Sequence, residues 1–163
     1  MSRVKNQKME SRAQANQISV CLLNAHTAMI YRFHFPYKFE SLNKMMRTHW
    51  AVRKKRQEEI MAAVEHAANP PIPKFYGKAR LTIIRQWGKR GRAFDPDNLV
   101  ASCKMLIDCL KEPKGRSNYG LGIIRDDSSA DIELLVKQEK SPDGVHRAII
   151  IFEGNIIQGE TDV

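Results

Sequence analysis

The sequence predicts an α+β domain in which two helices pack on a small mixed sheet, in the order β-α-β-α-β-β. Short runs of β-branched and aromatic residues alternate with two longer segments of helical spacing, and proline or glycine separates them. The 163 residues contain no internal repeat and no low-complexity tract. This length suits one domain with its own core and is too short for two full-sized domains.

The chain divides into three predicted regions. Its N-terminal residues are polar and show no apolar periodicity, so we expect residues 1–28 to form a poorly ordered extension. Residues 29–155 are expected to form the folded domain and residues 156–163 a tail. Because Met29 directly precedes the first convincing strand, we also hypothesise that the extension is dispensable.

The first half of the domain is predicted as strand, helix, strand. Residues 30–35 (IYRFHF) favour a strand, which Pro36 ends because proline lacks the N–H that a ladder needs. A loop should follow, then a helix over 50–68, which is rich in helix formers and ends at the NPPIP segment. Residues 79–87 (ARLTIIRQW) favour the second strand.

The second half is predicted as helix, strand, strand. The second helix should run from residue 96 to about residue 111, followed by a glycine-containing loop. Residues 131–139 and 146–152 favour strands, and the SPDG segment between them carries turn residues in a suitable order. We therefore expect these two strands to form a hairpin.

Composition and charge favour a polyanionic partner. Lysine and arginine total 27 against 18 acidic residues, which gives a net charge of +9 and a pI near 9.6. The three cysteines form no metal or disulfide motif, which favours a reducing, cytoplasmic setting. The longest apolar run, residues 18–30, is too short to span a bilayer, so no membrane association is expected.

The second predicted helix has two distinct faces. Asp95 suits the N-cap and Pro96 the first helical position. Advancing about 100° per residue places Asp97, Lys104 and Asp108 on one outward stripe, opposite an apolar face. Capping by Asp95 and an ordinary Lys104–Asp108 surface pair would also account for these residues one pair at a time.

A second acidic pair, Asp126–Asp127, follows a short apolar run, where turn chemistry is the simpler explanation. If this pair returns beside the start of the second helix, Asp95, Asp97, Asp126 and Asp127 converge and require a divalent cation, for which Mg²⁺ or Mn²⁺ is suited. Metal-bound carboxylates in basic surroundings are typical of phosphodiester hydrolysis.

Three motifs occur in the order that one nuclease family shows. DPDN at 95–98, KMLIDCL at 104–110 and GIIRDD at 122–127 resemble the RusA family of Holliday junction resolvases, small endodeoxyribonucleases of phages and prophages. The resemblance also includes FPYKFESLN at 35–43, and it extends over residues 30–153. In the family pattern the lysine stands where this chain has Ala101, on the same helical face as Lys104.

The resemblance implies a homodimeric, Mg²⁺-dependent enzyme that resolves four-way DNA junctions by paired symmetric nicks during recombination and repair. It implies that Asp95, Asp97, Lys104 and Asp127 are catalytic, and that Asp95, Asp97, Asp126 and Asp127 hold the metal. Two alternatives remain: a non-catalytic protein that binds branched DNA, and a nuclease that acts on other branched replication intermediates.

Candidate DNA contacts lie in three basic segments. The run at the start of the first predicted helix is either a solvated face or a phosphate-contacting surface. The preceding loop and the helix start, where Ser41, His49 and Trp50 are further candidates, and the glycine-rich segment before the second helix supply the others. The residues are Asn43, Lys44, Arg47, Arg53, Lys54, Lys55, Arg56, Lys89, Arg90 and Arg92.

Overall fold

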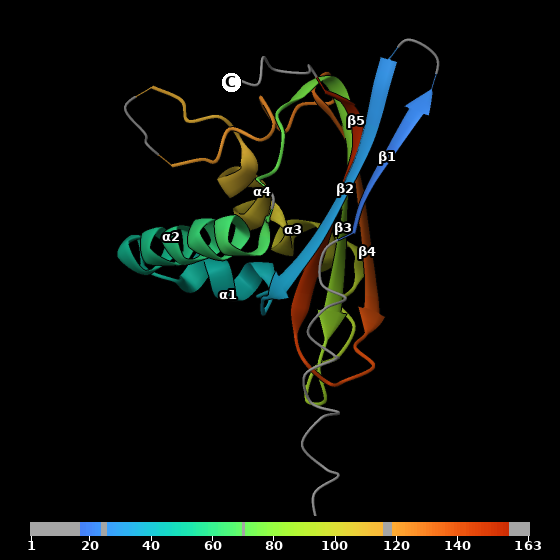
Figure 1. Cartoon of the computed structure of the whole chain (residues 1–163). Coiled ribbons are helices and arrows are strands. Elements are labelled where there is room, and N and C mark those ends of the chain that lie inside the picture. Colours follow the sequence, from blue (N-terminus) through green and yellow to red (C-terminus); the bar gives the residue numbers. More distant parts are fainter. Residues whose placement is uncertain (1–16, 24–25, 70, 116–118, 157–163) are drawn as a thin grey trace, which may run out of the picture.

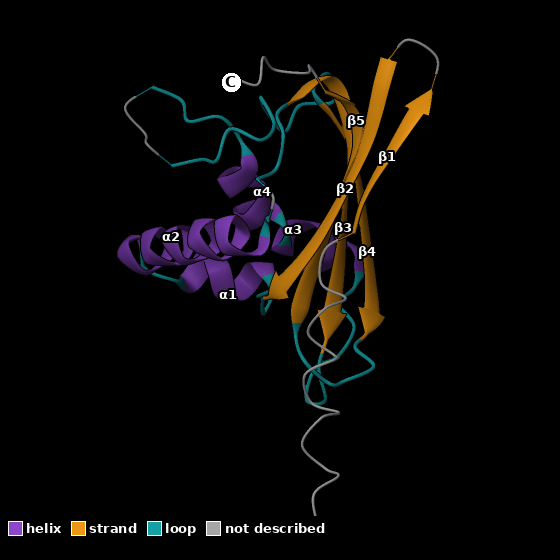
Figure 2. Cartoon of the chain, in the orientation of Figure 1, coloured by secondary structure: helices purple, strands orange, loops and turns teal. Residues whose placement is uncertain are grey.

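The chain folds into a five-stranded mixed sheet with helices on one face (Figures 1 and 2). The computed structural model describes residues 17–23, 26–69, 71–115 and 119–156. The elements are β1 (Gln17–Leu23), β2 (His26–Pro36), α1 (Leu42–Arg47), α2 (Trp50–Ala67), β3 (Phe75–Trp87), α3 (Pro96–Ser102), α4 (Lys104–Leu110), β4 (Ile132–Lys140) and β5 (Arg147–Ile156). The predicted α+β class is confirmed.

Among the strands that the structure describes, the order is β1-β2-β5-β3-β4, and only β3 and β4 pair in parallel. The predicted hairpin of β4 and β5 is wrong, because β3 lies between them. The SPDG segment does reverse the chain, but β5 pairs with β2 and β3 instead. β4 has mostly exposed side chains, as suits an edge strand, whereas β3 is buried on both faces and takes an interior position.

The folded region begins earlier than predicted. β1 pairs antiparallel with β2 from Gln17↔Arg32 to Leu23↔His26, so residues 17–23 and 26–28 belong to the sheet and not to a poorly ordered extension. Their apolar run supplies a strand for the edge of β2 that would otherwise be unpaired. The rest of the predicted extension, residues 1–16, and residues 157–163 of the predicted tail lie outside the described residues.

The core forms between the sheet and the helices. Tyr31, Phe33 and Phe35 of β2 are buried, while the alternate residue Arg32 is exposed, as the two-residue period of a strand requires. Against this face pack Ile60 and Val64 of α2, and Leu106 and Leu110 of α4. The N-terminal half of α2 contributes nothing to this core, and its apolar residues Trp50 and Val52 are exposed.

The second predicted helix is divided at Cys103 into α3 and α4. The Leu99 carbonyl, which would accept the Cys103 N–H in a regular helix, accepts bonds from Ser102 Oγ at 2.7 Å and Cys103 Sγ at 3.4 Å. The Cys103 N–H turns to the Val100 carbonyl, at 3.1 Å, which tightens the helix locally. The predicted apolar face is nevertheless buried throughout both helices. Helix α1 forms where a loop was predicted.

None of the helices in the described part of the chain combines the length and the apolar composition that crossing a membrane requires.

Candidate active site

Three lysines and three aspartates from α4 and the loop that follows it form a connected network, here called the Lys–Asp cluster. Lys104 Nζ lies 2.5 Å from Asp127 Oδ2 and 3.0 Å from Asp108 Oδ1. Lys111 Nζ lies 2.7 Å from Asp108 Oδ1 and 3.3 Å from Asp127 Oδ1. Lys114 Nζ lies 2.5 Å from Asp126 Oδ2 and completes the cluster. Lys104 and Asp127 are thus brought into direct contact across 23 residues of sequence.

Backbone hydrogen bonds explain how the second acidic motif reaches α4. The Leu110 carbonyl accepts bonds from the N–H groups of Ile123 and Ile124, at 3.0 and 3.1 Å, and the Glu112 N–H donates to the Ile124 carbonyl. Carbonyls at a helix C-terminus lack partners within the helix, so the GIIRDD segment satisfies one of them. The same contacts place Asp126 and Asp127 beside the side chains that α4 presents.

Hydrogen bonds within the cluster shift the pKa values of Lys104, Asp126 and Asp127 so that their charged forms are favoured. The hydrogen bond from Lys104 lowers the pKa of Asp127 well below its usual range, against the opposing effect of partial burial. Partial burial would lower the pKa of Lys104, but its bonds to Asp127 and Asp108 outweigh this and raise the pKa above its ordinary value. Lys114 and the backbone N–H of Asp127 lower the pKa of Asp126.

Asp95 and Asp97 lie at the first turn of α3. Asp95 is the N-cap, since its side chain accepts bonds from the Asn98 N–H at 3.0 Å and from Asn98 Nδ2 at 2.7 Å. These bonds lower the pKa of Asp95. Asp97 is exposed and precedes Ala101 by four residues on the same helical face. Ala101 lines a cleft together with Lys104, Asp108 and Asp127, so Asp97 lies one helical turn from the cleft wall.

The donor atoms suit a hard divalent cation, but their arrangement does not form a ready metal site. All four predicted ligands are carboxylates, the donors that Mg²⁺ prefers. Within the described residues, however, no group of three or more Asp, Glu, His or Cys side chains is placed to hold a metal ion. Lysines already contact Asp126 and Asp127, so a cation there would have to displace some of these contacts.

Five of the ten predicted DNA contacts line two hollows. Arg53 and Lys54 line the cleft of about 620 Å³ that contains Lys104, Asp108 and Asp127. A second hollow of about 450 Å³ lies beside Asp95; of the predicted contacts, Asn43, Lys44 and Arg92 line it. Two cations are engaged within the protein, because Lys44 and Arg56 both pair with Glu40. The remaining four predicted DNA contacts are exposed: Arg47, Lys55, Lys89 and Arg90.

A buried arginine that the sequence did not single out holds the segment of chain that leads into α3. Arg85 of β3 is 4% exposed, and its guanidinium lies 3.7 Å from the ring centroid of Phe94. It donates to the Arg92 carbonyl at 2.9 Å and to Gln138 Oε1 at 3.0 Å. Gln138 in turn bonds both the N–H and the carbonyl of Phe94, at 2.9 and 2.7 Å. The peptide directly before Asp95 is therefore fixed to the sheet.

The sequence held one weak signal for this arrangement, an arginine within the otherwise apolar run LTIIRQW. Its partner could not be found by spacing, since Arg85 and Gln138 meet only through the parallel register of β3 and β4.

Thiol chemistry is not supported at this site. Cys103 and Cys109 are free and buried, and burial raises the pKa of each to about 12. A reactive thiol requires a lowered pKa and access to solvent.

Comparison of the chain with models of known protein families gave no match, and comparison with curated proteins gave none either.

Proposed function

We propose that this protein is a Mg²⁺-dependent endodeoxyribonuclease that cuts four-way DNA junctions as a homodimer during recombination and repair. The observation that carries the proposal is the contact between Lys104 and Asp127 beside Asp108, at a cleft that basic side chains also line. Two of the three motifs that resemble the RusA family meet there. The third, at the start of α3, lies one helical turn away through Asp97 and Ala101.

Each residue has a distinct role in this proposal. Asp97 and Asp127 would hold the cation, with Asp95 and Asp126 beside them. Bound there, Mg²⁺ would activate water and stabilise the charge that develops on the phosphate. Lys104, a cation in contact with Asp127, would stabilise the negative charge that develops on the phosphate. Arg53 and Lys54 would hold the backbone phosphates of the bound strand.

The symmetry of the proposed substrate supports the proposal of a homodimer. A four-way junction with two-fold symmetry presents two equivalent strands, and an isologous dimer presents two equivalent sites. A cytoplasmic location is proposed with it, since the free cysteines suit a reducing compartment.

A labelled four-way junction tests the proposal. Wild-type protein should give Mg²⁺-dependent nicks at symmetric positions on two opposed strands. Asp97→Asn should reduce cleavage by about 10²- to 10³-fold, the usual effect of losing a group that stabilises the transition state, and should leave junction binding intact. Replication forks and flaps serve as comparison substrates. Faster cleavage of these than of the junction would keep the nuclease and change its substrate.

One observation favours a non-catalytic protein that binds branched DNA. Every carboxylate of the Lys–Asp cluster already has a lysine partner, so the cluster is satisfied without a metal. Tight junction binding without cleavage in Mg²⁺ or Mn²⁺ would support this alternative and exclude the nuclease.

A further inference from the structure

The cleft above the Lys–Asp cluster has an apolar wall that neither phosphate binding nor metal binding explains. Its volume of about 620 Å³ falls within the range of about 300–1,000 Å³ typical of small-molecule pockets. Large apolar side chains from α1, α2, α3 and β4 form the wall: Leu42, Met46, Trp50, Val100 and Leu134. Lys104, Asp108 and Asp127 lie on the same cleft.

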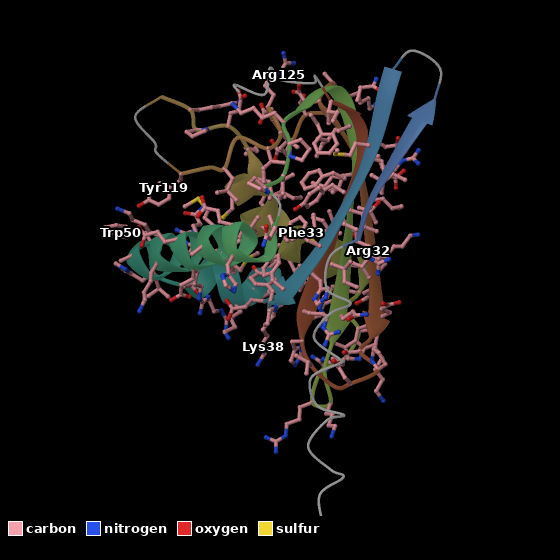
Figure 3. The ribbon with its side chains drawn as sticks, viewed as in Figure 1. Arg32, Phe33, Lys38, Trp50, Tyr119 and Arg125 are labelled. Carbon is pink, nitrogen blue, oxygen red and sulfur yellow. The ribbon has the colours of Figure 1, made fainter. Side chains whose placement is uncertain are left out.

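This wall is unusually exposed. The exposed fractions are 71% for Met46, 64% for Trp50 and 51% for Val100. Trp50 lies at the outer end of α2, away from the sheet (Figure 3). Soluble monomers seldom gather large apolar side chains at one exposed place unless a partner or ligand covers them.

The charges beside the wall indicate what covers it. Arg53 and Lys54 follow Trp50 by three and four residues, so they lie on the same face of α2. Neither forms an ion pair with a carboxylate within the described residues, and Lys54 lies 5.3 Å from the ring centroid of Tyr119. An occupant with a flat apolar face and an adjoining negative charge matches this combination. A second copy of the chain would instead bring like charges together.

We propose that the cleft is a binding pocket for an unpaired nucleobase, which stacks on Trp50 while Arg53 and Lys54 hold the neighbouring phosphates. Aromatic stacking beside cations is the common way of binding single-stranded DNA, and it tolerates any base. The inference rests on the proposed function for its ligand, DNA. It adds that the strand beside Lys104 and Asp127 is unstacked when it binds, which favours branched DNA over continuous duplex.

The fluorescence of Trp50 gives a readout that does not depend on cleavage. The chain has two tryptophans, so Trp87→Phe leaves Trp50 as the only one. In EDTA, titration of this variant with single-stranded oligothymidylate should quench the Trp50 emission, whereas an equal length of blunt duplex should quench it much less. Absence of quenching at concentrations where the oligonucleotide binds would overturn the proposal.

Matched substitutions test the same point in the chain with its native Trp87. Trp50→Leu should weaken binding of oligothymidylate and of the four-way junction by about 5- to 150-fold, the effect expected when one stacked base is lost, with less change for duplex. Trp50→Phe keeps a ring and should restore most of the affinity. Because Trp50 is exposed, both variants should fold and melt like the wild type. Equal affinity of Trp50→Leu and wild type would overturn the pocket.

Light scattering tests the other possible occupant of the cleft, a second copy of the chain. If Trp50→Leu converts a dimer into a monomer, the wall is an interface between copies of the chain and the nucleobase pocket is wrong. The proposed nuclease can fail separately. Quenching without cleavage of any DNA in Mg²⁺ would retain the pocket and remove the nuclease, and cleavage without quenching would do the reverse.

Discussion

Replacing Gln138 by leucine should destabilise the protein far more than removing the buried charge that Gln138 contacts. The amide makes three hydrogen bonds, one with Arg85 Nη1 and two with the backbone of Phe94. Gln138→Leu removes all three and leaves a buried guanidinium, an N–H and a carbonyl to find other partners. At about 1–3 kcal/mol for each buried group left without a partner, and allowing for water near the half-buried Phe94, we expect a loss of about 3–6 kcal/mol.

Arg85→Met should cost only about 1–2 kcal/mol. It leaves the Arg92 carbonyl without its guanidinium donor and removes the contact with the Phe94 ring, but it also removes a charge whose burial is itself unfavourable. Gln138 keeps both of its bonds to Phe94 in this variant. The double variant should therefore be more stable than the sum of the two single losses predicts.

Urea denaturation of the four proteins measures these differences. A loss below about 1 kcal/mol for Gln138→Leu, or additive losses in the double variant, would show that the Arg85–Gln138 network does not support the peptide before Asp95. Hydrogen exchange gives a further readout, because the Phe94 N–H donates to Gln138 Oε1. Gln138→Leu should lower the protection of the Phe94 amide from exchange in the folded state.

Further changes separate structure from function at the same site. Asp95→Ala should cost about 0.5–2 kcal/mol of unfolding free energy through loss of the N-cap, whereas Asp95→Ser should keep the cap. If the carboxylate is needed for cleavage, both variants should be inactive. An active Asp95→Ser variant would remove Asp95 from the metal site. Lys104→Met should change stability by less than about 1 kcal/mol, because Lys104 is 55% exposed, yet reduce junction cleavage by about 10²- to 10³-fold. The Lys104–Asp127 pair should contribute the same amount to the unfolding free energy at every pH between about 5 and 9. The stabilisation from Asp127 is lost only as pH falls below the carboxyl's ordinary pKa of 3.8 and through its lowered folded value, and that from Lys104 is lost only as pH rises above 10.5. A difference in unfolding free energy between wild type and Asp127→Asn that varies across this window would contradict the assignment. Deleting residues 1–23 should leave the core intact but expose the edge of β2, so we expect self-association by light scattering, and a monodisperse, equally stable product would show that β1 is dispensable.

Local patterns in the sequence were sufficient for the fold class and for the buried face of α3 and α4. The helical spacing of Leu99, Leu106 and Leu110 predicts their burial even though the helix is divided at Cys103. The division changes the hydrogen bonding but barely changes the side of the helix on which these residues lie. The strand order was beyond such patterns. A turn signal such as SPDG predicts that the chain reverses, but the neighbour of β5 is chosen by the burial of β3 on both faces, which is a property of the whole sheet.

The candidate site was predictable in part. Resemblance to a family joined Lys104 with Asp127, and the structure brings these two side chains into contact. The same acidic residues are neutralised by Lys111 and Lys114, at the end of α4 and in the loop beyond it. Sequence spacing does not predict the direction of a side chain there, because the chain is no longer helical. The sequence offered Trp50 as one of several candidate DNA contacts, but only the structure shows that its ring is 64% exposed, at the end of α2 that projects away from the sheet.

Cleavage of a supercoiled plasmid that extrudes a cruciform tests the proposed nuclease most directly, because paired cuts across a junction produce linear DNA and unpaired cuts produce nicked circles. We expect the wild-type protein to linearise the plasmid in Mg²⁺ and to leave it intact in EDTA, and we expect Asp97→Asn to bind the cruciform without cutting it. A wild-type protein that binds the cruciform and leaves it uncut in both Mg²⁺ and Mn²⁺, or an Asp97→Asn variant that linearises it at the wild-type rate, would contradict the proposed function.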